Sequence, residues 1–275
     1  MPVGHQPPPV DMSEILSPQD LAFSRPAVAQ LDEIQLLVGL IDPDTVVGGL
    51  MLDVGAHRGG SLAPFWNAGW TVVAFEPDPR HYQELSTAIQ GVDRIILDGR
   101  AVSSVSGERV TFYMSEESPG ISGLSAFRDS HVAVGTVETV ALRDVLDDEH
   151  VHLLKVDTEG YDLFVLQGYP FERSRPGVIM AEFEDYKTVP LGYRFADLAG
   201  LLVEQGYQVW VSEWHPIIRY GISHQWRRLF RYGRREPDPD GWGNVIALKD
   251  PIDDATMLSA LSGVVRVRDP LLRDP

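Results

Sequence analysis

The sequence predicts an α/β fold whose core is a mostly parallel β-sheet with helices on both faces. Short apolar runs repeatedly end in an acidic residue or a glycine, and segments of helical length separate these runs along the chain. Strands that alternate with helices favour a parallel sheet, because each helix carries the chain back to the edge where the next strand begins. The 44% hydrophobic content of the 275 residues is sufficient for a packed core.

The first half of the chain supplies these elements in alternation. Residues 1–16 are rich in proline and are expected to form a flexible leader, whereas residues 17–44 are expected to be a helical segment that begins near Ser17. The runs "GLMLDVGA", "TVVAFEPD" and "RIILDGRAV" are apolar enough for buried strands. The predicted strands are 49–56, 71–78, 94–102, 108–115 and 136–142, and the predicted helices are 17–41, 59–69, 79–90 and 143–149.

The second half continues the alternation to the end of the sheet. The predicted strands are 151–157, 177–184, 207–214 and 242–249, and the predicted helices are 160–168 and 194–205. There is no internal repeat and no shift in composition that would mark a boundary. Residues 45–275 are therefore expected to form one domain, with residues 214–243 as a long insertion between its last two strands.

Charge and composition exclude several classes of protein. The formal net charge of −17 argues against nucleic-acid binding, which needs basic patches. There is no cysteine, so neither disulfides nor thiolate metal sites are expected. No apolar run reaches the roughly 18 residues of a membrane-spanning helix, and the first residues, "MPVGHQPPPV", do not resemble a signal peptide. A cytoplasmic protein is the expectation.

The ends of the first two strands carry the residues of a nucleotide-binding site. In parallel sheets, ligands bind beyond the carboxyl ends of the strands. Gly55 and Gly59 in "DVGAHRGG" permit a tight turn and a close approach of a ligand to the backbone. Asp53 can accept hydrogen bonds there, and Glu76, about twenty residues beyond the turn, can accept both hydroxyls of a ribose. An ordinary glycine turn is the alternative interpretation.

The type of nucleotide follows from the order of these residues. A nicotinamide site favours a G-x-G-x-x-G turn, whereas here Asp53 precedes Gly55-Ala56-His57-Arg58-Gly59-Gly60. An acid, a glycine turn and an acid that ends the next strand are similar to the S-adenosylmethionine (SAM) site of class I methyltransferases. That fold closes its sheet with a reversed strand, which "WGNVIALK" can supply after "YQVWVSEW".

A narrower resemblance covers roughly residues 45–190. "LDVGAHRGGSLAPF", "VVAFEPDPRHYQEL", "RAVSSVSGERVTFYM", "VETVALRDVL", "LLKVDTEGYDLFVLQG" and "VIMAEFED" follow one another as in FkbM-type methyltransferases, and "KVDTEGYD" is the most specific of them. The resemblance implies a Rossmann-like class I methyltransferase with a seven-stranded sheet and a reversed last strand. It also implies SAM-dependent O-methylation of hydroxyls of sugars, other glycans or polyketide and other natural products.

The same resemblance implies which residues bind SAM. Asp53, Gly55 and Glu76 are expected to contact it, with adenine-side contacts near Asp98 to Val102. At His57 many members carry Asn, so the role of this side chain stays open. The complete set of expected cofactor-binding residues is Asp53, Gly55, His57, Gly59, Glu76, Asp98, Arg100, Ala101 and Val102.

The end of strand 151–157 is expected to hold the catalytic groups. Lys155 and Asp157 share a face of the strand, Glu159 lies at the start of the next helix, and Glu182 and Glu184 share a face of the following strand. Lys155 is expected to pair with Asp157, Glu182 or Glu184. Asp157 or Glu159 can act as the base that deprotonates the acceptor hydroxyl. Two alternatives are a purely structural ion pair or helix cap, and a Mg²⁺ ion held by Asp157 and Glu182.

The insertion 214–243 combines arginines with aromatic residues in an otherwise acidic chain. We expect it to bind the acceptor or to form the contact of a homodimer, because both kinds of surface are rich in such residues. Residues 116–135 are expected to form a second lid. The acceptor-binding candidates are Glu182, Trp214, His224, Trp226 and Arg227, with His215 as a further candidate base.

The sequence therefore predicts a SAM-dependent O-methyltransferase that acts on a small-molecule or glycan hydroxyl. One alternative is an NAD-dependent oxidoreductase, although the chain has no Tyr-x-x-x-Lys pair for hydride transfer. Another is a non-catalytic interaction module that keeps the fold of a SAM-binding protein.

Overall fold

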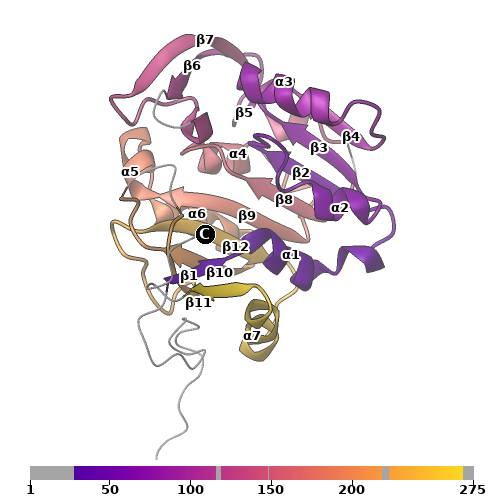
Figure 1. Ribbon diagram of the computed structural model, residues 1–275, viewed down its shortest axis with the longest axis vertical. Coiled ribbons are helices and arrows are strands. Elements are labelled where there is room, and N and C mark those ends of the chain that lie inside the picture. Colours follow the sequence, from indigo (N-terminus) through magenta and orange to yellow (C-terminus); the bar gives the residue numbers. More distant parts are fainter. Residues whose placement is uncertain (1–27, 116–118, 148, 219–222, 269–275) are drawn as a thin grey trace, which may run out of the picture.

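The main sheet brings eight strands together in the order β11-β10-β12-β9-β8-β2-β3-β4. We describe a computed structural model of residues 28–115, 119–147, 149–218 and 223–268 (Figure 1). The predicted leader and the part of the predicted helix before residue 28 lie outside these residues. The strands are β2 (Leu50–Val54), β3 (Thr71–Phe75), β4 (Ile95–Asp98), β8 (Leu153–Val156), β9 (Val178–Glu184), β10 (Gln208–Trp214), β11 (Trp226–Arg231) and β12 (Trp242–Leu248).

The strand directions confirm the predicted sheet. Strands β4, β3, β2, β8 and β9 pair in parallel, so their carboxyl ends meet at one edge. Strand β12 lies between β9 and β10 and is antiparallel to both, which makes it the predicted reversed strand. The additional strand β11 falls within the predicted insertion 214–243 and pairs with β10 at the edge of the sheet.

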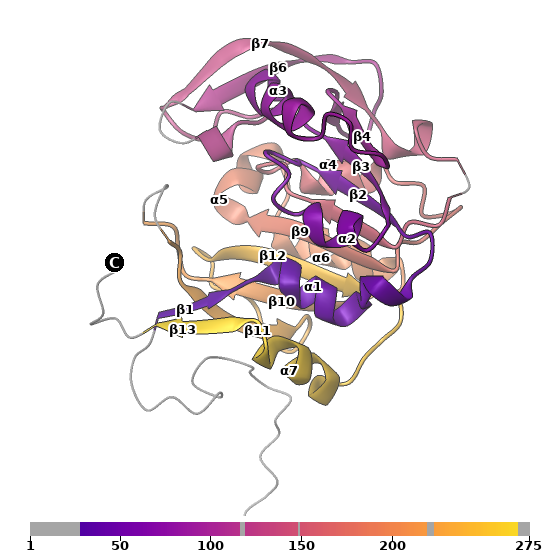
Figure 2. The same ribbon diagram turned by 45° about the vertical axis from the view of Figure 1, so that its right-hand side comes forward.

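Two predicted strands belong to a different sheet. β6 (Arg109–Ser115) and β7 (His131–Val140) pair with each other, and β7 also pairs with β5 (Ala101–Val102). The predicted strand 94–102 is thus divided between β4 and β5, because the chain leaves the main sheet after Asp98. This three-stranded sheet forms an arch at one end of the molecule (Figures 1 and 2).

Two apolar clusters fill the two faces of the main sheet. One contains Leu163 and Leu166 of α4 (Asp162–Gln167) and Leu198 and Leu202 of α6 (Phe195–Glu204). The other contains residues of four further helices, for example Leu37 of α1 (Glu33–Ile41). The predicted helices on both faces are therefore present. The α-helices are α1 (Glu33–Ile41), α2 (Ala63–Asn67), α3 (Pro79–Ala88), α4 (Asp162–Gln167), α5 (Asp185–Thr188), α6 (Phe195–Glu204) and α7 (Asp254–Ser262).

The N-terminal segment differs from its prediction. Residues 28–31 form strand β1 (Val28–Leu31), which pairs antiparallel with β13 (Val265–Arg268), so the predicted helix over 17–41 is wrong there. The helix begins only at Glu33, after the carboxylate of Asp32 accepts a hydrogen bond from the backbone N–H of Gln35. Likewise, the helix predicted over 143–149 is only a short 3₁₀ turn, Leu142–Asp144. No helix among the described residues is long and apolar enough to span a membrane.

Candidate active site

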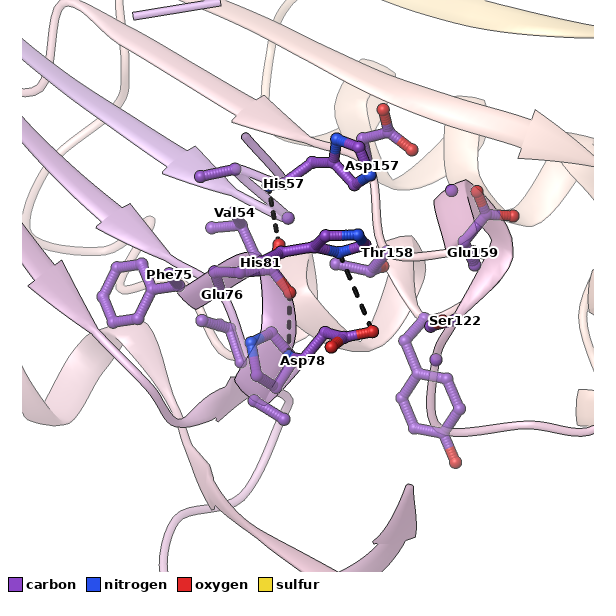
Figure 3. A pocket seen from close by; sticks show the side chains of 18 of the residues that line it. Val54, His57, Phe75, Glu76, Asp78, His81, Ser122, Asp157, Thr158 and Glu159 are labelled. Atoms are coloured by element: carbon purple, nitrogen blue, oxygen red, sulfur yellow. Dashed lines mark hydrogen bonds and ion pairs between the residues drawn. The ribbon is translucent and has the colours of Figure 1, made fainter. Parts of the chain in front are cut away.

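A cavity of about 420 Å³ opens at the carboxyl ends of β2, β3 and β8 (Figure 3). This is the edge of the sheet where the sequence predicts a nucleotide, and the volume is typical of small-molecule sites. The lining residues that matter below are Gly55, His57, Gly60, Ser61, Glu76, Asp78, Ala101, Val102, Lys155, Asp157 and Glu159.

The turn after β2 packs directly against the segment after β8. Gly55 has a φ of +81°, and a Cβ atom there would lie 1.8 Å from the carbonyl oxygen of Asp157. Backbone N–H groups of Gly55 and Ala56 both donate to the carbonyl of Phe75, at 3.0 Å each. Gly55 is therefore required by both the left-handed backbone and the close approach of two strand ends.

Replacing Gly55 with alanine should destabilise the fold by roughly 2–5 kcal/mol, because strain in the left-handed region adds to a clash with backbone. A thermal-unfolding curve measures this loss. Gly60→Ala is the matched control in the same turn, since its Cβ would meet no atom within 4 Å. Equal unfolding temperatures for the two variants would contradict the tight packing described for Gly55.

Asp53 is completely buried and supports the cavity from beneath. Its carboxylate accepts a hydrogen bond from the hydroxyl of Ser61 and another, at 3.1 Å, from the ammonium of Lys155. The two strands are in register, so that Asp53 lies opposite Lys155. The ammonium of Lys155 also lies 3.6 Å from the carboxylate of Asp157. Lys155 thus links the ends of the predicted strands 49–56 and 151–157, which are β2 and β8.

The charge of Lys155 is stabilised by these neighbours. Burial alone disfavours the ammonium, but the carboxylates of Asp53 and Asp157 outweigh burial, so the pKa of Lys155 is raised. The predicted pairing with Asp157 is confirmed. Pairing with Glu182 or Glu184 is wrong, because a different ammonium, that of Lys187, lies 2.9 Å from each of them.

Glu76 is held by the backbone on both sides of its carboxylate. The N–H of His57 donates to Oε2 at 2.6 Å and the N–H of Asp78 donates to Oε1 at 2.8 Å. Figure 3 shows this carboxylate between the two loops, with Asp157 and Glu159 across the cavity. Burial raises the pKa of Glu76 to about 7, although these two N–H groups partly offset the effect. Each oxygen keeps a lone pair for a ligand hydroxyl.

Not all of the residues predicted to bind the cofactor line the cavity. Ala101 and Val102 do, together with Gly55, His57 and Glu76. Asp98 and Arg100 instead form a close ion pair with each other, at 2.5 Å, and neither is part of the lining. Gly59 is also absent from the lining, where the adjacent Gly60 and Ser61 take its place.

Part of the predicted lid 116–135 closes this cavity. Gly120, Ser122, Gly123 and Leu124 contribute to the lining, and Phe112 of β6 adds an apolar contact. The imidazole of His131 on β7 lies 2.7 Å from the carbonyl of Ile121 and fixes this segment against the small sheet. Residues 116–118 of the predicted lid lie outside the described part of the chain.

A second cavity of about 540 Å³ adjoins the first. Ile34, Lys155 and Asp157 line both. The side chain of Asp157 is 44% exposed, whereas that of Lys155 is only 10% exposed. Asp157 is therefore the accessible carboxylate at the boundary between the two spaces. The other residues of the second lining are Gln30, Leu31, Asp32, Glu33, Met180, Glu182, Trp214, Ser223, His224, Trp242, Asn244 and Arg266.

Acidic side chains at the ends of β8 and β9 gather around one buried ammonium. One carboxylate oxygen from each of Asp157, Glu159 and Glu182 lies within 4.8 Å of the others, so the predicted Mg²⁺ ligands Asp157 and Glu182 are brought together. The ammonium of Lys187 lies 2.6 Å from Glu159 and 2.9 Å from Glu182. Burial raises the pKa values of both glutamates, to about 7 for Glu159.

Within the predicted insertion 214–243, residues 226–231 form strand β11 of the main sheet. Trp226 begins β11, is buried, and donates its indole N–H to the hydroxyl of Ser212 at 3.2 Å. Arg227 forms ion pairs with Glu213 at 3.2 Å and Asp238 at 2.5 Å. Neither residue lines either cavity, so their contacts are structural. Arg219 and Tyr220 of the insertion lie outside the described residues.

Other candidates from this segment do reach the second cavity. Trp214 and His224 are part of its lining, and Glu182 from β9 joins them. His215 lines neither cavity. It contacts a lining residue only through its backbone carbonyl, which accepts a hydrogen bond from the indole N–H of Trp242 at 3.0 Å.

Sequence reasoning missed Glu33, Lys187 and Asn244, and it included Trp242 only as one of the aromatic residues of the segment 214–243. Glu33 follows a helix-capping aspartate and looks like an ordinary first-turn acid. Lys187 lies in "DYKT", which carries no motif. Trp242 and Asn244 lie on the strand predicted to close the sheet, and alternation along a strand could have placed them on one face.

Comparisons with known proteins identify the family. The family described as "Methyltransferase FkbM domain" matches residues 53–209. No curated protein matches. Among solved structures, the chain is similar to magnesium protoporphyrin IX methyltransferase from Synechocystis, with 11% identity, a TM-score of 0.43, and 79% of this chain and 82% of that chain covered. It is also similar to an O-methyltransferase from Bacillus cereus, with 14% identity, a TM-score of 0.40, and 79% of each chain covered. These values are too low to identify an acceptor.

Proposed function

This chain belongs to the FkbM methyltransferase family, and we propose that it transfers the methyl group of SAM to a hydroxyl of a sugar, an oligosaccharide or a glycosylated or polyketide natural product. The methyl donor follows from the family, because these enzymes are SAM-dependent. Membership of this family also excludes the alternative of an NAD-dependent oxidoreductase. The observation that supports transfer to oxygen is Asp157, a partly exposed carboxylate that lines both the first cavity and the adjoining one.

The residues of the first cavity fit SAM. Glu76 presents a carboxylate whose orientation is fixed by two backbone N–H groups, as binding of a ribose diol requires. Carboxylates outnumber cations in the lining, which suits a positively charged ligand: Asp78, Asp157 and Glu159 accompany Glu76, whereas Lys155 is neutralised from below by Asp53. The imidazole Nε2 of His57 is buried at the cavity without a hydrogen-bond partner, so it is available to a polar group of the ligand.

SAM affinity should increase as the pH rises from 6 to 8. Ribose hydroxyls donate hydrogen bonds and SAM is cationic, so both favour the ionised form of Glu76, whose pKa of about 7 means that it is partly protonated at neutral pH. Below that pKa, binding must release a proton, and the dissociation constant should rise by up to about tenfold per pH unit. Calorimetric titrations across this range measure the slope.

The control for this pH dependence is Glu76→Gln, which cannot titrate at this position and should bind weakly, with a smaller slope that comes from Glu159, whose pKa is also raised to about 7. The lowered pKa values of His57 and His81, caused mainly by burial, place their titration below that of Glu76. An identical slope in wild type and Glu76→Gln would assign the proton to another group.

Methyl transfer to a hydroxyl at the boundary between the two cavities requires a group that accepts the hydroxyl proton. SAM supplies a methyl group on a positively charged sulfur. In the proposed reaction the acceptor oxygen bonds to that methyl carbon, the carbon–sulfur bond breaks, and the hydroxyl proton passes to a carboxylate oxygen of Asp157. Lys155, 3.6 Å from Asp157 and fixed by Asp53, holds this carboxylate in position. Positioning of the two reactants contributes roughly 7–11 kcal/mol in comparable cases.

Lys187 makes a metal-free reaction the simpler hypothesis. Its ammonium contacts the carboxylates of Glu159, Glu182 and Glu184. The ammonium thus provides the positive charge that Mg²⁺ would otherwise supply to these carboxylates. We therefore expect EDTA to leave the rate of methyl transfer unchanged. Measured rates before and after dialysis against EDTA, with readdition of Mg²⁺, test this. A rate restored only by the metal would assign Asp157 and Glu182 as ligands.

A transfer assay tests the proposed function itself. Purified protein is incubated with methyl-labelled SAM and a panel of hydroxylated acceptors, and products are identified by mass spectrometry and NMR. The proposal expects label in a new O-methyl group. SAM binding by calorimetry, without transfer to any acceptor of a broad panel, would instead support the non-catalytic interaction module.

A further inference from the structure

The second cavity has a rigid aromatic wall. The indole rings of Trp214 and Trp242 lie side by side, with centroids 5.5 Å apart and planes inclined by 27°. The indole N–H of Trp242 donates to the carbonyl of His215 at 3.0 Å, which fixes the ring, and His224 packs edge-on against it at 5.3 Å. Trp242 is only partly buried, so it offers an apolar face to a ligand.

A polar wall comes from the N-terminal helix and the reversed strand. The carboxylate of Glu33 accepts hydrogen bonds from the indole N–H of Trp214 at 3.2 Å and from the amide of Asn244 at 2.8 Å. Both donors are neutral. The hydroxyl of Ser212 is a third hydrogen-bond partner of Glu33. A carboxylate has about four acceptor positions, so Glu33 can still accept a hydroxyl group of a ligand.

The charges of the lining are unequal. Its acidic groups are Asp32, Glu33, Asp157 and Glu182, and its basic groups are Lys155 and Arg266, with His224 as a further titratable group. Glu182 is paired with Lys187, and burial raises the pKa of Glu33 to about 7, so the negative charge comes from Asp32, Asp157 and the ionised fraction of Glu33. Lys155 is already paired with Asp53 and Asp157. A ligand with a negative charge would therefore meet like charges in a partly enclosed space, where repulsion is stronger than in water.

The position of this cavity relates it to the methyl donor. It meets the first cavity at Ile34, Lys155 and Asp157. Of its fifteen lining residues, only Lys155, Asp157, Met180 and Glu182 fall within residues 53–209, and the other eleven come from the flanking segments. The shared domain thus supplies the reacting edge, whereas this chain's own ends supply most of the second cavity.

We propose that the second cavity is the acceptor site and that it takes a hydroxylated ring without negative charge, such as a neutral sugar. The ring packs against Trp242, its hydroxyls are accepted by Glu33, and the hydroxyl to be methylated lies at Asp157. This assignment rests on the proposed O-methylation and specifies its substrate class. The lining residues outside the shared domain then determine which acceptor is used; they are residues 30–34, Trp214, Ser223, His224, Trp242, Asn244 and Arg266.

Binding of matched sugars to the protein saturated with S-adenosylhomocysteine (SAH) tests the assignment without turnover. The probes are methyl glycosides of common hexoses, each as the neutral sugar, the amino sugar and the uronic acid, observed by saturation-transfer NMR and titrated. We expect neutral probes to bind and their uronic acids not to bind. Glu33→Gln and Trp242→Leu should each weaken the neutral probe about tenfold or more, as expected for loss of a charged hydrogen bond or of a stacked face.

Two controls separate this result from general damage. Glu204→Gln removes an exposed carboxylate of α6 outside both cavities and should change nothing. All three variants should keep wild-type SAH affinity, because Glu33 and Trp242 line only the second cavity. Absence of binding by every neutral probe, preferential binding of uronic acids, or unchanged binding in both Glu33→Gln and Trp242→Leu would overturn the assignment.

The two proposals fail in different ways. Sugars that bind in a Glu33-dependent manner without methyl transfer would reject O-methylation of these sugars but retain the ring-binding site. Methyl transfer with acceptor KM values unchanged in Glu33→Gln and Trp242→Leu would retain the O-methyltransferase and reject this cavity as its acceptor site.

Discussion

Asp157→Asn is expected to lower kcat for methyl transfer by roughly 10²–10⁴-fold, the usual contribution of a positioned general base. The amide has the shape of the carboxylate but cannot take the hydroxyl proton. Because the side chain is 44% exposed and is not required to hold the sheet together, the protein should fold and bind SAM with nearly unchanged affinity. Single-turnover rates and calorimetry measure the two quantities separately.

Glu159→Gln is the informative comparison for Asp157→Asn. Glu159 lines the first cavity but not the second, and its carboxylate, which is 12% exposed, contacts the ammonium of Lys187 at 2.6 Å, so it is less accessible to an acceptor hydroxyl. We expect a smaller loss of kcat, accompanied by a lower unfolding temperature. Near-normal turnover in both variants would direct the search for the base to His224, the histidine in the second cavity.

Glu76→Ala is expected to weaken SAM binding by roughly 1.5–3 kcal/mol, which corresponds to about 10- to 150-fold in Kd. The substitution removes the acceptor for the ribose hydroxyls and also leaves the N–H groups of His57 and Asp78 without their partner. Calorimetry with SAM measures the change. Glu84→Ala is the matched control, because Glu84 is exposed on α3 and pairs with Arg58 outside the cavity lining.

An unchanged Kd in folded Glu76→Ala protein would reject Glu76 as the ribose-binding residue. A loss of equal size in Glu84→Ala would show instead that the effect is electrostatic and not specific to the cavity. The same titrations repeated at higher salt distinguish these cases, since exposed charges are screened within about 8–10 Å at physiological ionic strength.

The strand ends of this protein could be predicted because they break a strong pattern. Asp53, Glu76 and Asp157 each follow a buried apolar run, where a charge is costly unless it is paired or functional. The parallel sheet then brings such residues to one edge. For this reason a cavity at this edge of the sheet could be predicted from the residues themselves, and Asp157 was one of the three partners predicted for Lys155.

Membership of a particular sheet could not be predicted in the same way. The segments 108–115 and 136–142 alternate like strands of any sheet, and nothing local distinguishes the three-stranded sheet from the main one. The same limit applies to residues 28–31, whose partner is more than 230 residues away in β13. Pairing between distant segments depends on the whole fold rather than on local propensity.

Aromatic and charged residues were the least predictable from sequence. Trp226 and Trp242 each begin a strand of the main sheet, yet Trp226 lies in the core whereas Trp242 faces the second cavity. Lys187 and Lys155 are both buried among acids, but each serves a different set of carboxylates. Which side chain pairs with which is decided by register, and one residue of shift would exchange the faces of a strand.

A crystal structure of the protein with SAH would show whether the first cavity holds the methyl donor beside the second. We expect SAH in the first cavity, with its ribose hydroxyls on Glu76 and its sulfur on the side of Asp157 that faces the second cavity. SAH bound away from Glu76, or with its sulfur separated from Asp157 by the protein, would contradict the assignment of both sites.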